Sequence, residues 1–253
     1  MNPSDTATPP PLPTPPGATA PDAGSWGPMT GPPTLGNTLD HLLKRPAALV
    51  HTLHNEPSGR LLKWLGLSSL VGLSLFGLVL GFFSGGMQFW AAPLKMVIGV
   101  SASALLTWPS LCVFCYLNGL DLPLRTISGI LVAAIALLSL LLLALAPVAW
   151  IFSTSTDSVP FMGFLVLAFW LVGLYFGLAL IFQTAHLLGM KRRHHLVAWS
   201  VIFLFVTLQM STTLRPLLGK SDHFCTGEKK FFLNHWLEQC EAQSGTTPGR
   251  GWH

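Results

Sequence analysis

The sequence has very little charge. Only 9% of its 253 residues are Asp, Glu, Lys or Arg, against about 25% in an ordinary soluble domain, while 51% are hydrophobic. Too few charged side chains are available to cover a water-soluble surface. The 14 basic residues lie between apolar runs and form no stripe or patch, so the net charge of +4 does not indicate a nucleic-acid partner.

Signatures of catalysis are also lacking. The chain contains no G-x-G-x-x-G that opens a helix after a strand, no P-loop, no H-E-x-x-H and no G-x-S-x-G. His194 and His195 have no obvious nucleophile to activate. We therefore expect no enzymatic activity and no bound cofactor.

Only four cysteines are present. Cys112 and Cys115 spell C-x-x-C inside an apolar run, where cysteine is commonly a small buried hydrophobe and less often a redox or metal site. Cys225 and Cys240 lie outside the apolar runs and form a candidate disulfide if their compartment is oxidising. Two free thiols are the alternative, which would fit an inverted topology.

Metal-binding patterns are equally sparse. His51 and His54 share one face of a predicted helix, yet no cysteine or carboxylate cluster completes a site. We expect no bound metal.

The first 36 residues form a proline-rich segment. Eleven of the 20 prolines precede residue 34, and no Lys or Arg occurs there. Such a segment cannot bury enough apolar surface to offset its ordering entropy, so we expect a disordered tail. No secretory signal pattern occurs before residue 40. The prolines favour polyproline II, which predicts either a solvated spacer or a docking segment for an aromatic-lined groove.

Residues 37–63 have a different pattern. Leucines recur at helical spacing among His, Lys and Arg, which predicts one or two short amphipathic helices. Pro46 is suited to be the first residue of the second helix. The basic residues and low net hydrophobicity predict that this segment lies in the membrane interface and does not span the membrane.

Five uncharged apolar runs follow. Each is close to or above the roughly 20 residues that a helix needs to cross the hydrocarbon core. The runs are too long and continuous for barrel strands, so the sequence predicts an all-α membrane protein whose five-helix domain covers residues 64–218. The predicted spans are 64–83, 96–117, 127–152, 161–188 and 196–214.

Basic residues beside these spans predict the orientation. Eight lie on the side of the N-terminus, including Lys191, Arg192 and Arg193, which are candidate contacts for anionic lipid head groups. We therefore expect a cytoplasmic N-terminus and an integral membrane location, with a bacterial inner membrane favoured. Five crossings place residues 219–253, with a short amphipathic helix, on the extracytoplasmic side.

Polar groups inside the spans are few. Gln183, His186 and Gln209 are the candidate intramembrane polar contacts, and no carboxylate lies in a span. Two G-x-x-x-G pairs occur at 77–81 and 173–177, and we expect them to serve packing within the chain more than dimerisation.

The layout resembles that of the Yip1-like membrane proteins, particularly their bacterial members. The resemblance covers about residues 38–218 and depends on the cytoplasmic tail, the lead-in at 42–46 and the five closely spaced spans. It implies a scaffold, adaptor or accessory subunit with no catalytic residues, which binds membrane lipids and recruits protein partners through its tails or helix faces. The alternative is a facilitator or channel subunit for a small solute, with its path beside Pro109, Gln183 and Gln209.

Overall fold

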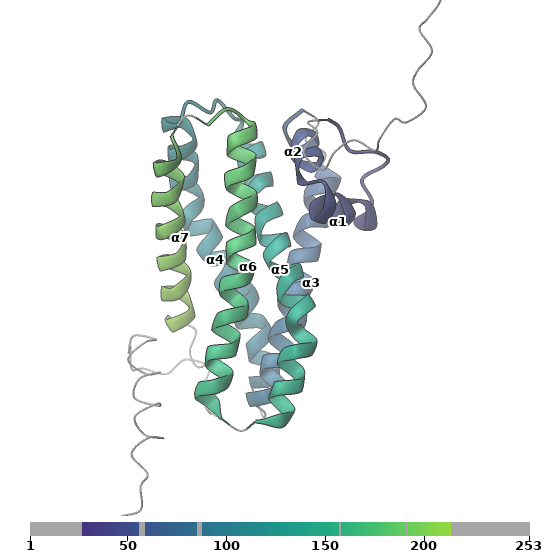
Figure 1. Cartoon of the computed structure of the whole chain (residues 1–253), viewed down its shortest axis with the longest axis vertical. Coiled ribbons are helices and arrows are strands. Elements are labelled where there is room, and N and C mark those ends of the chain that lie inside the picture. The colour runs from purple at the N-terminus through teal and green to yellow at the C-terminus, as the bar shows by residue number, and fades with distance from the viewer. Residues whose placement is uncertain (1–26, 56–58, 85–87, 157, 191, 214–253) are drawn as a thin grey trace, which may run out of the picture.

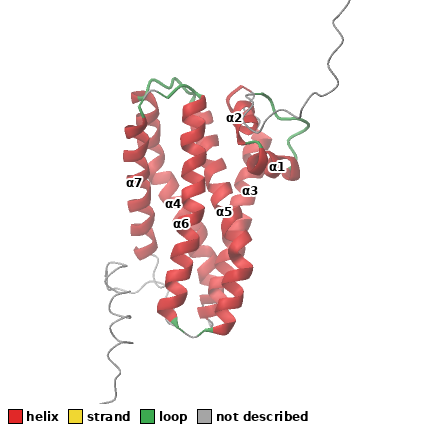
Figure 2. Cartoon of the chain, in the orientation of Figure 1, coloured by secondary structure: helices red, strands yellow, loops and turns green. Residues whose placement is uncertain are grey.

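The computed structural model describes residues 27–55, 59–84, 88–156, 158–190 and 192–213. These residues form seven α-helices, and no strand occurs among them (Figure 2). The fold is therefore the all-helical bundle that the sequence predicts. The helices are α1 (Leu35–Lys44), α2 (Pro46–Asn55), α3 (Gly59–Ser84), α4 (Gln88–Leu117), α5 (Leu124–Ser155), α6 (Val159–Leu187) and α7 (Arg193–Thr213).

Four of these helices are long and apolar enough to cross a membrane. They are α3, α4, α5 and α6, and they cover the first four predicted spans except for residue 188 at the end of the fourth. The fifth predicted span forms α7, which begins with Arg193, His194 and His195 and does not meet the same criterion over its described residues. The fifth crossing, and the extracytoplasmic C-terminus that depends on it, stay predictions.

The five long helices stand side by side and alternate in direction (Figure 1). α3 packs extensively against both α4 and α5, α5 packs against α6, and α4 packs against α7. α6 and α7 barely touch each other. The helices therefore form an open ring whose gap lies between α6 and α7.

Glycines set the closest helix contacts in this ring. A Cβ atom added at Gly77 would lie 2.6 Å from the Pro93 Cα atom, so α3 and α4 approach backbone to backbone. A Cβ atom at Gly177 would lie 3.0 Å from the Ala134 carbonyl oxygen, so α6 also lies close to α5. Membrane helices associate through such small-residue contacts. One glycine or more of each predicted G-x-x-x-G pair thus contributes to packing within the chain.

The two short helices lie at one end of the ring. α2 begins at Pro46, as the sequence predicts, and it buries Leu49, Val50 and Leu53. The Thr126 hydroxyl of α5 donates a 3.4 Å hydrogen bond to the Leu53 carbonyl. The apolar face of α2 is therefore covered by the bundle.

Residues 27–36, which the sequence predicted to be part of the disordered tail, are described by the structure, and residues 30–33 contact the helices. The Asn37 side chain donates to the carbonyl oxygens of Thr30 and Pro32, at 2.9 and 3.0 Å. The Trp64 indole of α3 donates to the Pro33 carbonyl at 3.0 Å. These contacts hold residues 30–33 against α1 and α3, which composition alone could not indicate. The remainder of the tail, residues 1–26, lies outside the described residues.

Candidate functional site

Basic side chains gather at the end of the bundle that carries α1 and α2. α3, α5 and α7 begin at this end, and the α4–α5 and α6–α7 loops also lie there (Figure 1). No acidic residue occurs in the first turn of any of these three helices. The basic residues of this end that the structure describes are Lys44, Arg45, Arg60, Lys63, Arg125, Arg192 and Arg193.

The two loops at this end leave their helices through the same turn. Gly119 and Gly189 have φ angles of 74° and 90°, which L side chains rarely adopt. The Leu120 N–H donates to the Cys115 carbonyl at 3.1 Å, and the Met190 N–H donates to the Ala185 carbonyl at 2.9 Å. This bonding is that of a Schellman motif after both α4 and α6. The two loops consequently start with fixed geometry.

Asn118 connects the two loops. Its side chain is only 2% exposed, and its Oδ1 atom accepts a 3.3 Å hydrogen bond from the backbone N–H of Arg192. Arg192 directly precedes the first residue of α7. The Nδ2 atom of the same side chain is buried and has no hydrogen-bond partner among the described residues. A buried amide group thus lies beside the N-terminus of α7 with its donor still available.

His195 lies in the first turn of α7. Its imidazole ring stacks on the Phe114 ring of α4, with ring centroids 6.3 Å apart. Its partial burial, together with the positive charges of His194 and Arg192, lowers the pKa of the His195 imidazole. Its Nδ1 atom is buried and lacks a hydrogen-bond partner in the described part of the chain. The local electrostatic environment therefore disfavours additional positive charge.

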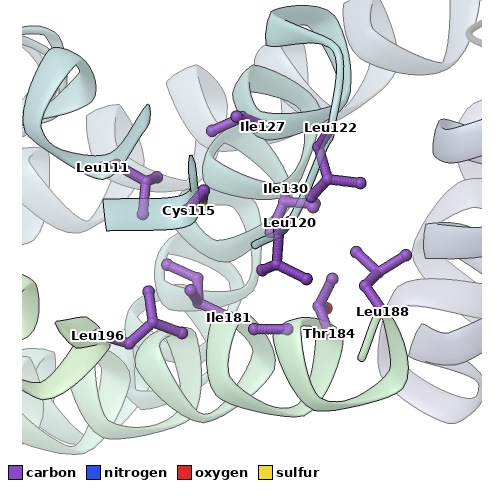
Figure 3. Close-up of a pocket in the computed structure, with 11 residues that line it drawn as sticks. Leu111, Cys115, Leu120, Leu122, Ile127, Ile130, Ile181, Thr184, Leu188 and Leu196 are labelled. Atoms are coloured by element: carbon purple, nitrogen blue, oxygen red, sulfur yellow. The ribbon is translucent and has the colours of Figure 1, made fainter. Parts of the chain in front are cut away.

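Two small apolar cavities lie inside the ring, each of about 20 Å³. The first lies directly beneath the two loops, and Figure 3 shows side chains from α4, α5, α6 and α7 directed toward it. It includes Leu120, Leu188 and Leu196, and the Thr184 hydroxyl oxygen. The second lies deeper and shares Ile181 with the first. Each of the two cavities is lined by residues of α4, α5, α6 and α7.

Thr107 and Trp108 of α4 connect three helices. The Trp108 indole of α4 donates to the Ser128 hydroxyl of α5 at 3.0 Å. The Trp199 indole of α7 donates to the backbone carbonyl of Thr107 at 3.1 Å. Trp199 is fully buried. Hydrogen bonds thus join this part of α4 to both α5 and α7.

The three predicted intramembrane contacts are not brought together. Gln183 and His186 are exposed on α6, and Gln209 is exposed on α7. None of them faces the cavities inside the ring. Of the predicted head-group contacts, Arg192 and Arg193 are exposed at the basic end, whereas Lys191 lies outside the described residues. The predicted disulfide partners Cys225 and Cys240 also lie outside them.

The described residues contain no group of three or more His, Cys, Asp or Glu side chains placed to hold a metal. The His51 Nε2 atom pairs with the Asn55 side chain at 3.0 Å. Cys112 and Cys115 are buried in α4 as free thiols. Neither predicted pair is part of a ligand cluster in this portion of the molecule.

Sequence reasoning missed Lys95. The predicted span started at Met96 and left Lys95 outside, but α4 begins eight residues earlier and buries this lysine to 2% exposure. The available signal was the apolar run at 89–94, which continues the helix across the charge. A buried ionisable residue in a membrane helix is costly and is commonly functional.

Comparison with known proteins adds no assignment. No protein-family model matches the chain, and no curated protein or solved structure is significantly similar to it. The resemblance to Yip1-like proteins therefore stays a prediction from the sequence.

Proposed function

We propose that this chain is a non-catalytic scaffold, adaptor or accessory subunit of a membrane, and that it recruits protein partners through its tails and helix faces. The observation that supports this proposal best is the fixed attachment of α4 to both of its neighbours. The Trp108 indole joins α4 to α5, and the Trp199 indole joins α7 to α4. Helices held in fixed positions suit a protein that holds others in place.

α6 offers a surface for such partners. Only 28% of the residues in the most apolar stretch of α6 are buried, compared with 56% of those in the most apolar stretch of α5. Phe164, Tyr175 and Phe176 are exposed on this helix. Aromatic residues provide large contact areas in protein interfaces.

Affinity purification of the full chain in mild detergent, followed by mass spectrometry, tests the scaffold proposal. We expect stoichiometric partners with the full chain and their loss after deletion of residues 1–33, with the deleted chain still inserted in the membrane. A full chain that purifies alone, or full retention of every partner by the shortened chain, would count against recruitment through the tail.

We further propose that the basic end faces the cytoplasm of a bacterial cell. Short loops on the cytoplasmic side are enriched in Lys and Arg, and seven basic residues lie at this end, whereas Lys95 lies toward the other end of α4. In a variant without native cysteines, Lys63→Cys should react with an impermeant maleimide in inverted membrane vesicles and not in intact spheroplasts. The opposite pattern would invert the topology.

Transport of a small solute is the second candidate, and buried Lys95 favours it. A positive charge inside a membrane protein can line an ion or solute path. If the chain is a facilitator with its path beside Lys95, Lys95→Met should reduce flux in reconstituted vesicles, whereas exposed Lys63→Met should not. A path beside Gln209, as the sequence predicts, would instead be blocked by Gln209→Leu, although Gln209 is exposed on α7. Unchanged flux in Lys95→Met and Gln209→Leu with intact assembly would leave the scaffold as the better description.

A further inference from the structure

The basic end combines two sources of positive potential. The N-terminus of a helix carries about half a positive charge from its aligned peptide dipoles and has N–H groups with no partner inside the helix. Acidic residues normally occupy such first turns, but α3, α5 and α7 have none there. Arg60, Arg125 and Arg193 lie in those first turns instead. An anion bound at this end would reduce the repulsion between the arginines and the positive helix N-termini.

α7 has the most complete set of groups for such an anion. Arg192 and Arg193 are exposed at its start, and the Arg192 N–H is held by Asn118. The Nδ2 atom of Asn118 is buried and lacks a partner among the described residues. Because Oδ1 and Nδ2 belong to one planar carboxamide, this free donor lies next to the first turn of α7. A 98% buried amide and two guanidinium groups thus accompany the helix terminus.

An apolar space lies directly beneath this group of donors. Leu120 follows Asn118 by two residues, Leu188 directly follows α6, and Leu196 lies in the first turn of α7, and all three line the upper cavity (Figure 3). The second cavity continues from Ile181 toward Trp170 and Phe203. Residues of α6 and α7, which barely touch each other, line both cavities together with residues of α4 and α5. A free phosphate ion would need the donors alone, whereas a lipid would use both the donors and the apolar boundary.

We propose that the start of α7, with Asn118, Arg192 and Arg193, binds the phosphate of an anionic phospholipid whose acyl chain lies along the α6–α7 boundary. Phosphate is suited to a helix N-terminus and to arginine, which binds it through two parallel hydrogen bonds. The acyl chain occupies the opening of the ring between α6 and α7. This site goes beyond the scaffold role and requires only that the basic end lies at the level of lipid head groups.

The test uses the full chain in mild detergent and native mass spectrometry. Dioleoyl phosphatidylglycerol and dioleoyl phosphatidylcholine, which have the same acyl chains, are titrated separately. We expect tighter binding of phosphatidylglycerol, and the double variant Arg192→Gln/Arg193→Gln should weaken it by about tenfold or more. The matched control Arg60→Gln removes an exposed arginine from the first turn of α3 and should change binding by less than about twofold.

A second variant tests the buried amide. Asn118→Asp keeps the size of the side chain and the acceptor for Arg192, but it replaces the free donor with a negative oxygen. We expect it to weaken phosphatidylglycerol binding by at least tenfold while phosphatidylcholine binding is unchanged. If Asn118→Asp fails to fold, the double arginine variant and its control still decide the question.

Several outcomes would overturn the site. Equal binding of the two lipids would mean that the site does not select an anionic lipid, and no loss in the double variant would mean that Arg192 and Arg193 do not hold it. Equal losses in the double variant and in Arg60→Gln would reduce the effect to general charge attraction. Competition by millimolar inorganic phosphate that displaces phosphatidylglycerol completely would indicate a site for free phosphate, which contradicts the role of the apolar boundary.

Discussion

The two sides of the ring are held together differently. α3 and α4 approach until Gly77 faces the Pro93 backbone, and α5 and α6 come nearly as close at Gly177. α6 and α7 barely touch, and residues of both helices line the two cavities. Dispersion energy accumulates where backbones meet without voids. The glycine contacts therefore stabilise their side of the ring more than the few contacts between α6 and α7 stabilise the other side.

The largest effect is expected at Gly77. In Gly77→Ala the new Cβ atom would lie 2.6 Å from the Pro93 Cα atom, and a backbone atom cannot turn aside as a side chain can. Overpacking of this kind destabilises by about 1–3 kcal/mol. The free energy of unfolding in mixed micelles should fall by that amount.

Gly66→Ala is the matched control on the same helix. Nothing lies within 4 Å of a Cβ atom added there, and alanine favours the helix. Its unfolding free energy should be unchanged or slightly raised. Equal losses in the two variants would mean that α3 and α4 are not in backbone contact at Gly77.

Trp199→Phe is expected to have an intermediate effect, because it weakens the attachment of α7 to α4. The variant keeps an aromatic ring but loses the indole N–H that donates to the Thr107 carbonyl at 3.1 Å. Hydrogen bonds between membrane helices contribute about 0.6 kcal/mol on average and up to about 2 kcal/mol. Because Trp199 is also fully buried, the smaller ring leaves a cavity, so unfolding measurements should show a loss of at least this size, with earlier proteolysis of α7.

The exposed Trp90 of α4 supplies the control, since Trp90→Phe removes an indole that is 76% exposed. It should leave both measurements unchanged. A Trp199→Phe variant that matches this control would show that packing alone holds α7 in place.

A smaller effect is expected where α2 meets α5. A Cβ atom added at Gly129 would lie 3.1 Å from Leu53 Cδ2, the far end of a flexible side chain. The Leu53 side chain can shift its χ angles at a cost of about 0.5–1.5 kcal/mol. Gly129→Ala should therefore destabilise the protein less than Gly77→Ala does. Thermal unfolding of both variants in one detergent compares them directly. A loss at Gly129 that exceeds the loss at Gly77 would place the rigid contact at α2.

Hydropathy and helix-start rules predicted the parts of this fold that depend on local sequence. The first four predicted spans lie within α3–α6 except for one residue beyond the end of α6, and Pro46 opens α2 as expected. Apolar length and the fixed φ angle of proline are properties of neighbouring residues, so one sequence suffices to recognise them. The helix α4 extends beyond the predicted boundary at Met96 because the apolar run on the other side of Lys95 continues it.

The candidate lipid site could be predicted only in part. Charge near the spans indicated Arg192 and Arg193, but Asn118 is 74 residues from Arg192 along the chain. Their contact depends on two Schellman turns that bring separate loops together at one end of the bundle. The open side of the ring likewise depends on which helices become neighbours, and hydropathy does not encode that order.

The smallest expected effect is a pH dependence at the start of α7. Because the pKa of His195 is lowered from 6.5 by its partial burial, His194 and Arg192, the unfolded chain binds this proton more readily than the folded chain. This contribution to stability is present above pH 6.5 and is lost as the pH falls below it. His195→Gln should therefore flatten the stability profile on the acidic side, and His194→Gln should flatten it less. Titration of His195 by NMR provides the direct measurement.

Added phosphatidylglycerol should raise the pKa of His195, since an anion at the start of α7 stabilises the imidazolium. If neither phosphatidylglycerol nor phosphatidylcholine changes the pKa of His195, the bound phosphate does not lie at α7.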